Sequence, residues 1–185
     1  MIQSKADLQK YIAEDMKFFH EFDKREQLIR RLTKDSAYMT TKYLVYLRKE
    51  EYYFNVRKNP FDTFMYLLFF RKKNILGNKL GFKIPRNCFG PGLTIAHHGE
   101  IIVNENAVIG ANALLHGGNC IGNNGTPGNA PTIGDGLDLG IGAKIIGNVT
   151  LGDNVIVGAN AVVTKSFEGN CTVVGLPAKK IKDNQ

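Results

Sequence analysis

The chain is poor in cysteine, with three among its 185 residues. Cys88, Cys120 and Cys171 are odd in number and widely spaced. This arrangement fits reduced thiols and provides neither a disulfide framework nor the paired spacing of a zinc site. We therefore expect no metal and assign these cysteines no chemistry.

Long apolar runs are also lacking. The longest aromatic and aliphatic stretch, Phe64 to Phe70, is far shorter than the roughly 20 residues that a membrane-spanning helix needs. Met1 is followed by the polar residues Gln3, Ser4 and Lys5, so no signal peptide is visible. We expect no membrane span and a cytoplasmic location.

Excess positive charge is confined to the first part of the chain. The net charge is +7, and residues 1–83 hold 18 Lys and Arg against 10 Asp and Glu, leaving 6 against 7 for the remainder. A basic segment can meet nucleic acid or anionic lipid, but here the positive residues alternate with acids and form no recognised nucleic-acid motif. We expect a solvated helical surface and no nucleic-acid partner.

An aliphatic residue recurs every six positions through the second part of the chain. A period of six matches neither a helix nor simple strand alternation, so these side chains must face inward from very short strands joined by tight corners. The pattern predicts a parallel β-solenoid whose coils stack about 4.8 Å apart. The repeated residues are Val103, Ile109, Leu115, Ile121, Ile133, Leu139, Ile145, Leu151, Val157 and Val163.

Composition changes sharply between residues 81 and 90. Ten of the eleven Phe and all seven Tyr lie before residue 90, and glycine dominates afterwards. The change predicts a mainly β protein in which an α-helical N-terminal segment, residues 1–76, precedes a β-helix domain, residues 77–185.

Three helical stretches are expected in the N-terminal segment. The first begins after Ser4, in an imperfect capping box, and extends through Phe19; the second covers about 34–51; the third begins near Pro60. Such helices can cover one end of the solenoid, which otherwise exposes apolar surface and unpaired strand edges. We expect core packing for the apolar face of the third helix, which contains Phe61, Phe64, Met65, Leu68 and Phe69.

Three stretches carry a resemblance to a known family. They are Leu93 to Glu105, which reads LTIAHHGEIIVNE, Leu139 to Lys144, which reads LGIGAK, and Val173 to Lys179, which reads VVGLPAK. Residues 75–182 thereby resemble the hexapeptide-repeat acyltransferases. Within them the chain is similar to the serine O-acetyltransferases and the related capsule and surface-polysaccharide O-acetyltransferases.

The resemblance implies a left-handed parallel β-helix with three hexapeptides per coil, assembled as a homotrimer with active sites between subunits. The handedness comes from the family, because the spacing alone does not give it. The resemblance also places acetyl-CoA along the side of the solenoid, near the C-terminal coils and the loop at residues 123–131 that interrupts the repeat. No metal is implied.

Acetyl transfer from a thioester to an alcohol needs a base, because a hydroxyl is a poor nucleophile while it keeps its proton. An imidazole, with an ordinary pKa near 6.5, can take that proton and return it to the CoA thiolate. The motif match gives this catalytic role to His97 and makes Glu105, or the nearby Glu100, a candidate for orienting the ring. The residues expected to bind the acceptor are His98, His116, for which a structural role is equally open, and Asn129.

For acetyl-CoA, glycine corners let backbone amides approach the pantetheine arm, and lysines can neutralise the phosphates. For the lysines, a purely solubilising role is the competing explanation. The expected cofactor-binding residues are Gly140, Gly142, Gly158, Ala159, Lys165 and Lys179.

The chain departs from the serine enzymes at several positions. Phe82 stands where the family has an aspartate that orients the histidine, and Ala96 and Asn129-Ala130 replace charged residues that hold the amino acid. These changes favour a neutral acceptor, although many similar chains share them. We expect an acetyl-CoA-dependent O-acetyltransferase acting on L-serine. The alternatives are transfer to a sugar hydroxyl in surface-polysaccharide biosynthesis, transfer of another acyl chain, and a non-catalytic solenoid scaffold.

Overall fold

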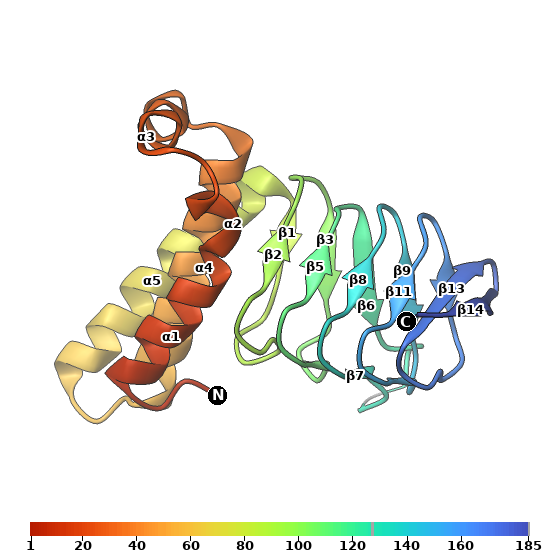
Figure 1. Cartoon of the computed structure of the whole chain (residues 1–185). Coiled ribbons are helices and arrows are strands. Elements are labelled where there is room, and N and C mark those ends of the chain that lie inside the picture. The colour runs from red at the N-terminus through yellow and green to blue at the C-terminus, as the bar shows by residue number, and fades with distance from the viewer. Residues whose placement is uncertain (127, 185) are drawn as a thin grey trace.

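The protein consists of helices followed by a stack of short strands (Figure 1). The structure is a computed structural model that describes residues 1–126 and 128–184. Figure 1 shows the helices gathered at one end of the stack, with α3 projecting beyond the others. The helices are α1 (Lys5–Asp15), α2 (Lys17–His20), α3 (Lys24–Thr33), α4 (Ser36–Asn55) and α5 (Pro60–Leu80).

The strands form three sheets, which are the three sides of the solenoid. Among the described residues, all strand pairings are parallel except that of β13 with β14, which closes the C-terminal end. The first sheet contains β1 (Phe82–Lys83), β3 (Ile101–Val103), β6 (Asn119–Gly122), β9 (Lys144–Ile146) and β12 (Val162–Val163). The second contains β4 (Val108–Ile109), β7 (Thr132–Ile133) and β10 (Thr150–Leu151). The third contains β2 (Thr94–Ile95), β5 (Leu114–Leu115), β8 (Asp138–Leu139), β11 (Ile156–Val157), β13 (Cys171–Gly175) and β14 (Ala178–Asp183).

The strand register gives the length of each coil. Val103 pairs with Ile121, and Ile145 pairs with Val163, so one coil takes eighteen residues, or three hexapeptides. Ile121 pairs with Ile145, twenty-four residues further on, because the loop at 123–131 lies between them. The predicted interruption of the repeat is therefore confirmed, although Pro127 lies outside the described residues.

The core is the repeat itself. All ten of the aliphatic residues at six-residue spacing are at most 3% exposed, as are the small corner residues Ala107, Ala113, Ala143 and Ala161. Burial of a Val, Leu or Ile side chain contributes about 1.5–3 kcal/mol relative to exposure, so the inward row is the main source of stability for the stack. The predicted solenoid is confirmed.

The helices differ from the expected boundaries in several places. The capping box is present, with Ser4 and Asp7 capping each other's backbone, but the first helix ends at Asp15 and α2 follows separately. The sequence reading missed α3, which is amphipathic but has no buried residue: its apolar side chains, Leu28, Ile29 and Leu32, are all exposed. The last helix, α5, continues to Leu80. The next residue, Gly81, ends the helix with a left-handed φ of 80°.

The aromatic face of α5 is only partly in the core. Phe69 is buried, as expected, whereas Phe61 and Phe64 are 64% and 61% exposed. Core packing was therefore the wrong prediction for these two side chains, because α5 carries aromatic residues on more than one side and meets the rings of α4 through Tyr66 and Phe69. Whether residues 1–76 and 77–185 are separate domains stays a prediction.

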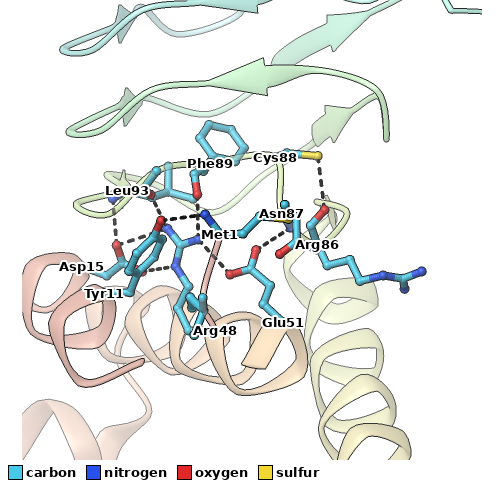
Figure 2. A network of polar contacts seen from close by, with 12 residues as sticks. Met1, Tyr11, Asp15, Arg48, Glu51, Arg86, Asn87, Cys88, Phe89 and Leu93 are labelled. Carbon is cyan, nitrogen blue, oxygen red and sulfur yellow. Dashed lines mark hydrogen bonds and ion pairs between the residues drawn. The ribbon is translucent and has the colours of Figure 1, made fainter. Parts of the chain in front are cut away.

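A buried ionic network joins the helices to the first coil (Figure 2). Arg48 of α4 is fully buried and donates from Nε to Asp15 of α1 at 2.7 Å and from Nη1 to Glu51 at 3.0 Å. The same guanidinium donates to the carbonyl oxygens of Phe89 and Gly90 at 3.0 and 2.6 Å. Backbone groups at the start of the solenoid, which have no preceding coil to pair with, are thus satisfied by side chains of the helices.

Candidate active site

Most of the predicted site residues lie along one edge of the solenoid. We call this the histidine edge; it consists of the corners between the third and first sheets, at residues 96–100, 116–118, 140–143 and 158–161. Backbone hydrogen bonds stack these corners, since Ala96 donates to Leu115, His116 to Leu139, Gly140 to Val157 and Gly158 to Val173. The structure therefore brings together His97, His98, His116, Gly140, Gly142, Gly158 and Ala159.

The corner that carries His97 and His98 is longer than the corresponding corner of the next coil. Five residues separate Ile95 from Ile101, whereas three separate their partners Leu115 and Asn119. The two additional residues enlarge the turn, and both histidines are exposed. The turn contains Gly99, whose φ of 136° suits glycine. The ring of His97 is accordingly in contact with solvent and not in the dry interior.

Contacts around the corner place the two imidazoles differently. His98 Nδ1 lies 3.0 Å from the hydroxyl of Ser36, the first residue of α4. His97 packs beside Gly117 of the next coil: a Cβ atom added to Gly117 would lie 3.8 Å from the Cβ atom of His97. Among the residues that the structure describes, no side chain hydrogen-bonds to the His97 ring. The helices thus help to form the histidine corner.

The histidine edge also contains a paired imidazole. His116 Nε2 lies 2.9 Å from Oδ1 of Asp138, and both side chains are about one-third exposed, at 35% and 39%. The sequence reading missed Asp138. The signal that could have found it is the register of the repeat, which sets Leu114 beside Asp138 and so brings that carboxylate close to His116.

A groove runs from this pair to the helices. It has a volume of about 450 Å³ and separates the outer surface of β2 and β5 from α1 and α2. His116 and Thr94 line it on the solenoid side, and Glu14, Phe18 and Glu21 line it on the helical side. We call it the side groove.

Three predicted residues lie on another edge. Glu105, Asn129 and Lys165 follow strands of the first sheet, so β3 separates Glu105 from the His97 corner of the same chain. Glu105 lines a separate cleft of about 700 Å³, together with Lys73 and the buried Glu50. No hydrogen bond joins Glu105 to His97 in the described part of the chain. The structure thus does not bring the predicted orienting acid to its histidine within one subunit.

The glycines of the histidine edge have a packing role of their own. A Cβ on Gly140 would lie 2.7 Å from the backbone nitrogen of Ala159, and one on Gly158 would lie 2.7 Å from Cγ1 of Val174. Gly142 has a left-handed φ of 72°. The same lack of side chains leaves partly exposed backbone beside His116. Lys179, on β14, is exposed at the C-terminal end of the stack.

Three further observations concern membrane spans, metal-binding groups and the cysteines. No helix among residues 1–126 and 128–184 is both long and apolar enough to cross a bilayer. Across the same residues, no group of three or more His, Cys, Asp or Glu side chains is placed to hold a metal ion. All three cysteines are free.

Residues 130–165 match the family described as Bacterial transferase hexapeptide (six repeats). Serine acetyltransferase from Neisseria gonorrhoeae has the same fold, with 26% identity, a TM-score of 0.74, and coverage of 98% of this chain and 69% of that one. Serine acetyltransferase from Brucella abortus strain S19 gives 21% identity, a TM-score of 0.74 and coverage of 98% and 71%. The soybean serine acetyltransferase apoenzyme gives 24% identity, a TM-score of 0.71, and coverage of 96% of this chain and 70% of that one. No curated protein matches the chain in sequence.

A repeat of six, a three-sided stack of parallel strands and the family match together define a hexapeptide-repeat acyltransferase. Within that class the chain is similar to the serine acetyltransferases, in its N-terminal helices as well as in its solenoid.

Proposed function

We propose that the chain is an acetyl-CoA-dependent O-acetyltransferase that transfers the acetyl group to the hydroxyl of L-serine. The observation that carries this proposal is the histidine edge, where an exposed histidine corner meets glycine corners on a fold shared with serine acetyltransferases. Solved serine acetyltransferases in complex with serine and with CoA are among the similar structures. They support the two substrates proposed for this chain.

His97 acts as the general base. Acetyl-CoA supplies the acetyl group as a thioester, and the acceptor hydroxyl attacks its carbonyl carbon. As the new C–O bond forms and the C–S bond breaks, His97 takes the hydroxyl proton and then gives it to the departing thiolate. His97 is exposed on its corner, so both substrates can reach the ring without any movement of the core.

The remaining parts of the proposal concern the assembly and the cosubstrate. The solenoid is left-handed and forms a trimer. In this trimer His97 of one subunit faces the edge of the next subunit that carries Glu105 and Asn129, so that these two residues reach the site from a neighbour. The backbone of Gly140, Gly142, Gly158 and Ala159 holds the pantetheine arm. Lys179 lies near its phosphates, and Lys165, which is on the other edge, reaches them from the neighbouring subunit. The cytoplasmic location stays a prediction.

A sugar hydroxyl is the second candidate acceptor. Ala96 precedes the proposed base, and Asn129-Ala130 occupies the loop, so neither place offers a charge to a zwitterionic amino acid. Ala130 is moreover buried and cannot contact an acceptor from the surface. These residues favour a neutral acceptor.

Release of CoA, followed with a thiol reagent, tests the function across serine, homoserine and sugar acceptors. We expect transfer from acetyl-CoA, and a 10²–10⁴-fold loss of rate in His97→Ala, which is the usual cost of removing a general base. His20→Ala is the matched control, because His20 is exposed on α2 and does not line the side groove. A signal with sugars and none with serine selects the second candidate. Purified protein that neither binds acetyl-CoA nor releases CoA with any acceptor is a scaffold.

A further inference from the structure

The pair formed by His116 and Asp138 has a defined protonation pattern. An ionised carboxylate only accepts hydrogen bonds, so the contact of 2.9 Å between Asp138 Oδ1 and Nε2 of His116 places a proton on Nε2. In the neutral ring the other nitrogen, Nδ1, then carries a lone pair. Asp138 therefore sets both the orientation of the imidazole and which nitrogen is free to accept a hydrogen bond.

This imidazole lies on the corner next to the one that carries His97. His116 is followed by Gly117, which packs directly against His97, so the two histidines occupy adjacent corners of the same edge. His116 also lines the side groove, whereas His97 is on the enlarged corner outside it. Ala96, the residue before His97, lines the side groove together with His116, so a molecule in this groove lies beside the corner that carries His97.

The charges of the side groove select for hydrogen-bond donors. Its helical side presents the carboxylates of Glu14 and Glu21 and the single cation Lys17, which is already paired with Glu14. Thr94 adds a hydroxyl on the solenoid side. A ligand carboxylate would meet more negative than positive charge here, whereas an ammonium or hydroxyl group would find acceptors.

We propose that His116, positioned by Asp138, binds a second donor group of the acceptor, next to the hydroxyl that His97 deprotonates. The acceptor class is then a 1,2-amino alcohol, of which serine is an example, or a vicinal diol of a saccharide. This inference rests on the proposed function and adds to it the acceptor-binding groove and the positioning residue Asp138. A purely structural role, in which the pair only joins adjacent coils, is the competing explanation.

Steady-state kinetics with paired acceptors separates the two explanations. One member of each pair lacks the second donor: 3-hydroxypropionate is compared with serine, or a deoxysugar with the parent sugar. In His116→Ala we expect KM for the complete acceptor to rise about 10–100-fold, as for a lost hydrogen bond to a charged group, with kcat within about threefold. KM for the acceptor without the second donor should stay unchanged. Asp138→Asn should also raise KM for the complete acceptor. In Asp138→Glu, which keeps a carboxylate, KM should rise less.

Three results overturn the inference. They are a fall in kcat with unchanged KM, which would make His116 the base itself; an equal rise in KM for both members of a pair; and no change at all. Circular dichroism checks the folding of each variant, and His116→Asn replaces His116→Ala if the latter does not fold. His20→Ala again serves as the control. Because the wild-type protein must first release CoA, a silent wild type contradicts the proposed function, whereas an active one with unaffected variants contradicts only this inference.

Discussion

Arg48 of α4 and Asp15 of α1 form a buried ion pair, 2.7 Å from Nε to Oδ2, that also holds the first coil of the solenoid. Asp15 Oδ1 accepts hydrogen bonds from the backbone nitrogens of Gly92 and Leu93 at 2.8 and 2.9 Å. Glu51 likewise accepts from the backbone nitrogen of Asn87 at 2.7 Å. Burial raises the pKa of Glu51 in spite of the neighbouring guanidinium. The helices therefore terminate the solenoid with charged groups that depend on one another.

Replacement of Arg48 should destabilise the whole chain. Arg48→Met leaves the buried carboxylates of Asp15 and Glu51 without their cation, and loss of one partner of a buried pair typically costs about 3–5 kcal/mol. Chemical denaturation followed by circular dichroism measures the change in the free energy of unfolding. We expect the helical and strand signals to be lost together, because the network joins both parts.

The matched control is Arg30→Met. Arg30 pairs with Glu26 and Asp35 on the surface of the helical segment, and its side chain is 25% exposed. Surface pairs contribute little to stability, so this variant should stay close to wild type. Equal effects of the two substitutions would show that the buried network does not hold the helices to the solenoid.

The sequence could predict the solenoid because its signal is repeated in every coil. Leu115, Leu139 and Val157 carry the same inward position through successive coils of the third sheet, and each is fully buried. The helical segment has no such redundancy. The apolar spacing of α5 suggested a buried face, yet whether Phe61 is covered depends on which side of the helix packs against α4, and local sequence does not contain this.

The site was predictable to a similar degree. The motif match selected His97, and the repeat offered the glycine corners, whereas only the structure shows that they share one edge with His116. The pair of His116 with Asp138 was missed because it joins residues twenty-two positions apart across a coil lengthened by the loop. The side groove was also missed, as it depends on where α1 and α2 pack.

Gly140 offers a test of what the glycines of the histidine edge do. In Gly140→Ala the new methyl group would lie 2.7 Å from the backbone nitrogen of Ala159 and 2.8 Å from the carbonyl oxygen of Val157. Neither atom is a movable side-chain end, so the coils must separate locally, and we expect a loss of about 1–3 kcal/mol. Thermal unfolding without acetyl-CoA measures it.

The control for that substitution is Gly122→Ala on β6. Its nearest neighbours would be Cys120 Sγ at 3.4 Å and Ile146 Cδ1 at 3.6 Å, which are ordinary contacts, so stability should change by about 0.5 kcal/mol or less. If Gly140→Ala unfolds like wild type but no longer binds acetyl-CoA, the glycine is there for the cosubstrate and the packing explanation is wrong.

The cysteines should be chemically quiet at neutral pH. Burial raises the pKa of Cys88 to about 12, so at pH 8 only about one thiol in ten thousand is the reactive thiolate. Since pH 8 and pH 9 both lie well below this pKa, the thiolate fraction of Cys88 increases about tenfold with each pH unit. Cys120 is the one half-buried thiol of the three, and although burial raises its pKa as well, it should react first.

Timed alkylation with iodoacetamide at pH 8 and pH 9, followed by mass spectrometry of peptides, measures the order of reaction. We expect Cys120 to be labelled before Cys88, and the slow labelling of Cys88 to accelerate with pH. Direct attack of the acceptor on the thioester uses no thiol, so Cys88→Ala, Cys120→Ala and Cys171→Ala should each keep CoA release within about threefold of wild type. Loss of turnover in a folded alanine variant would instead indicate an acyl-enzyme on that sulfur, and His97 would then need to be reinterpreted as the group that activates it.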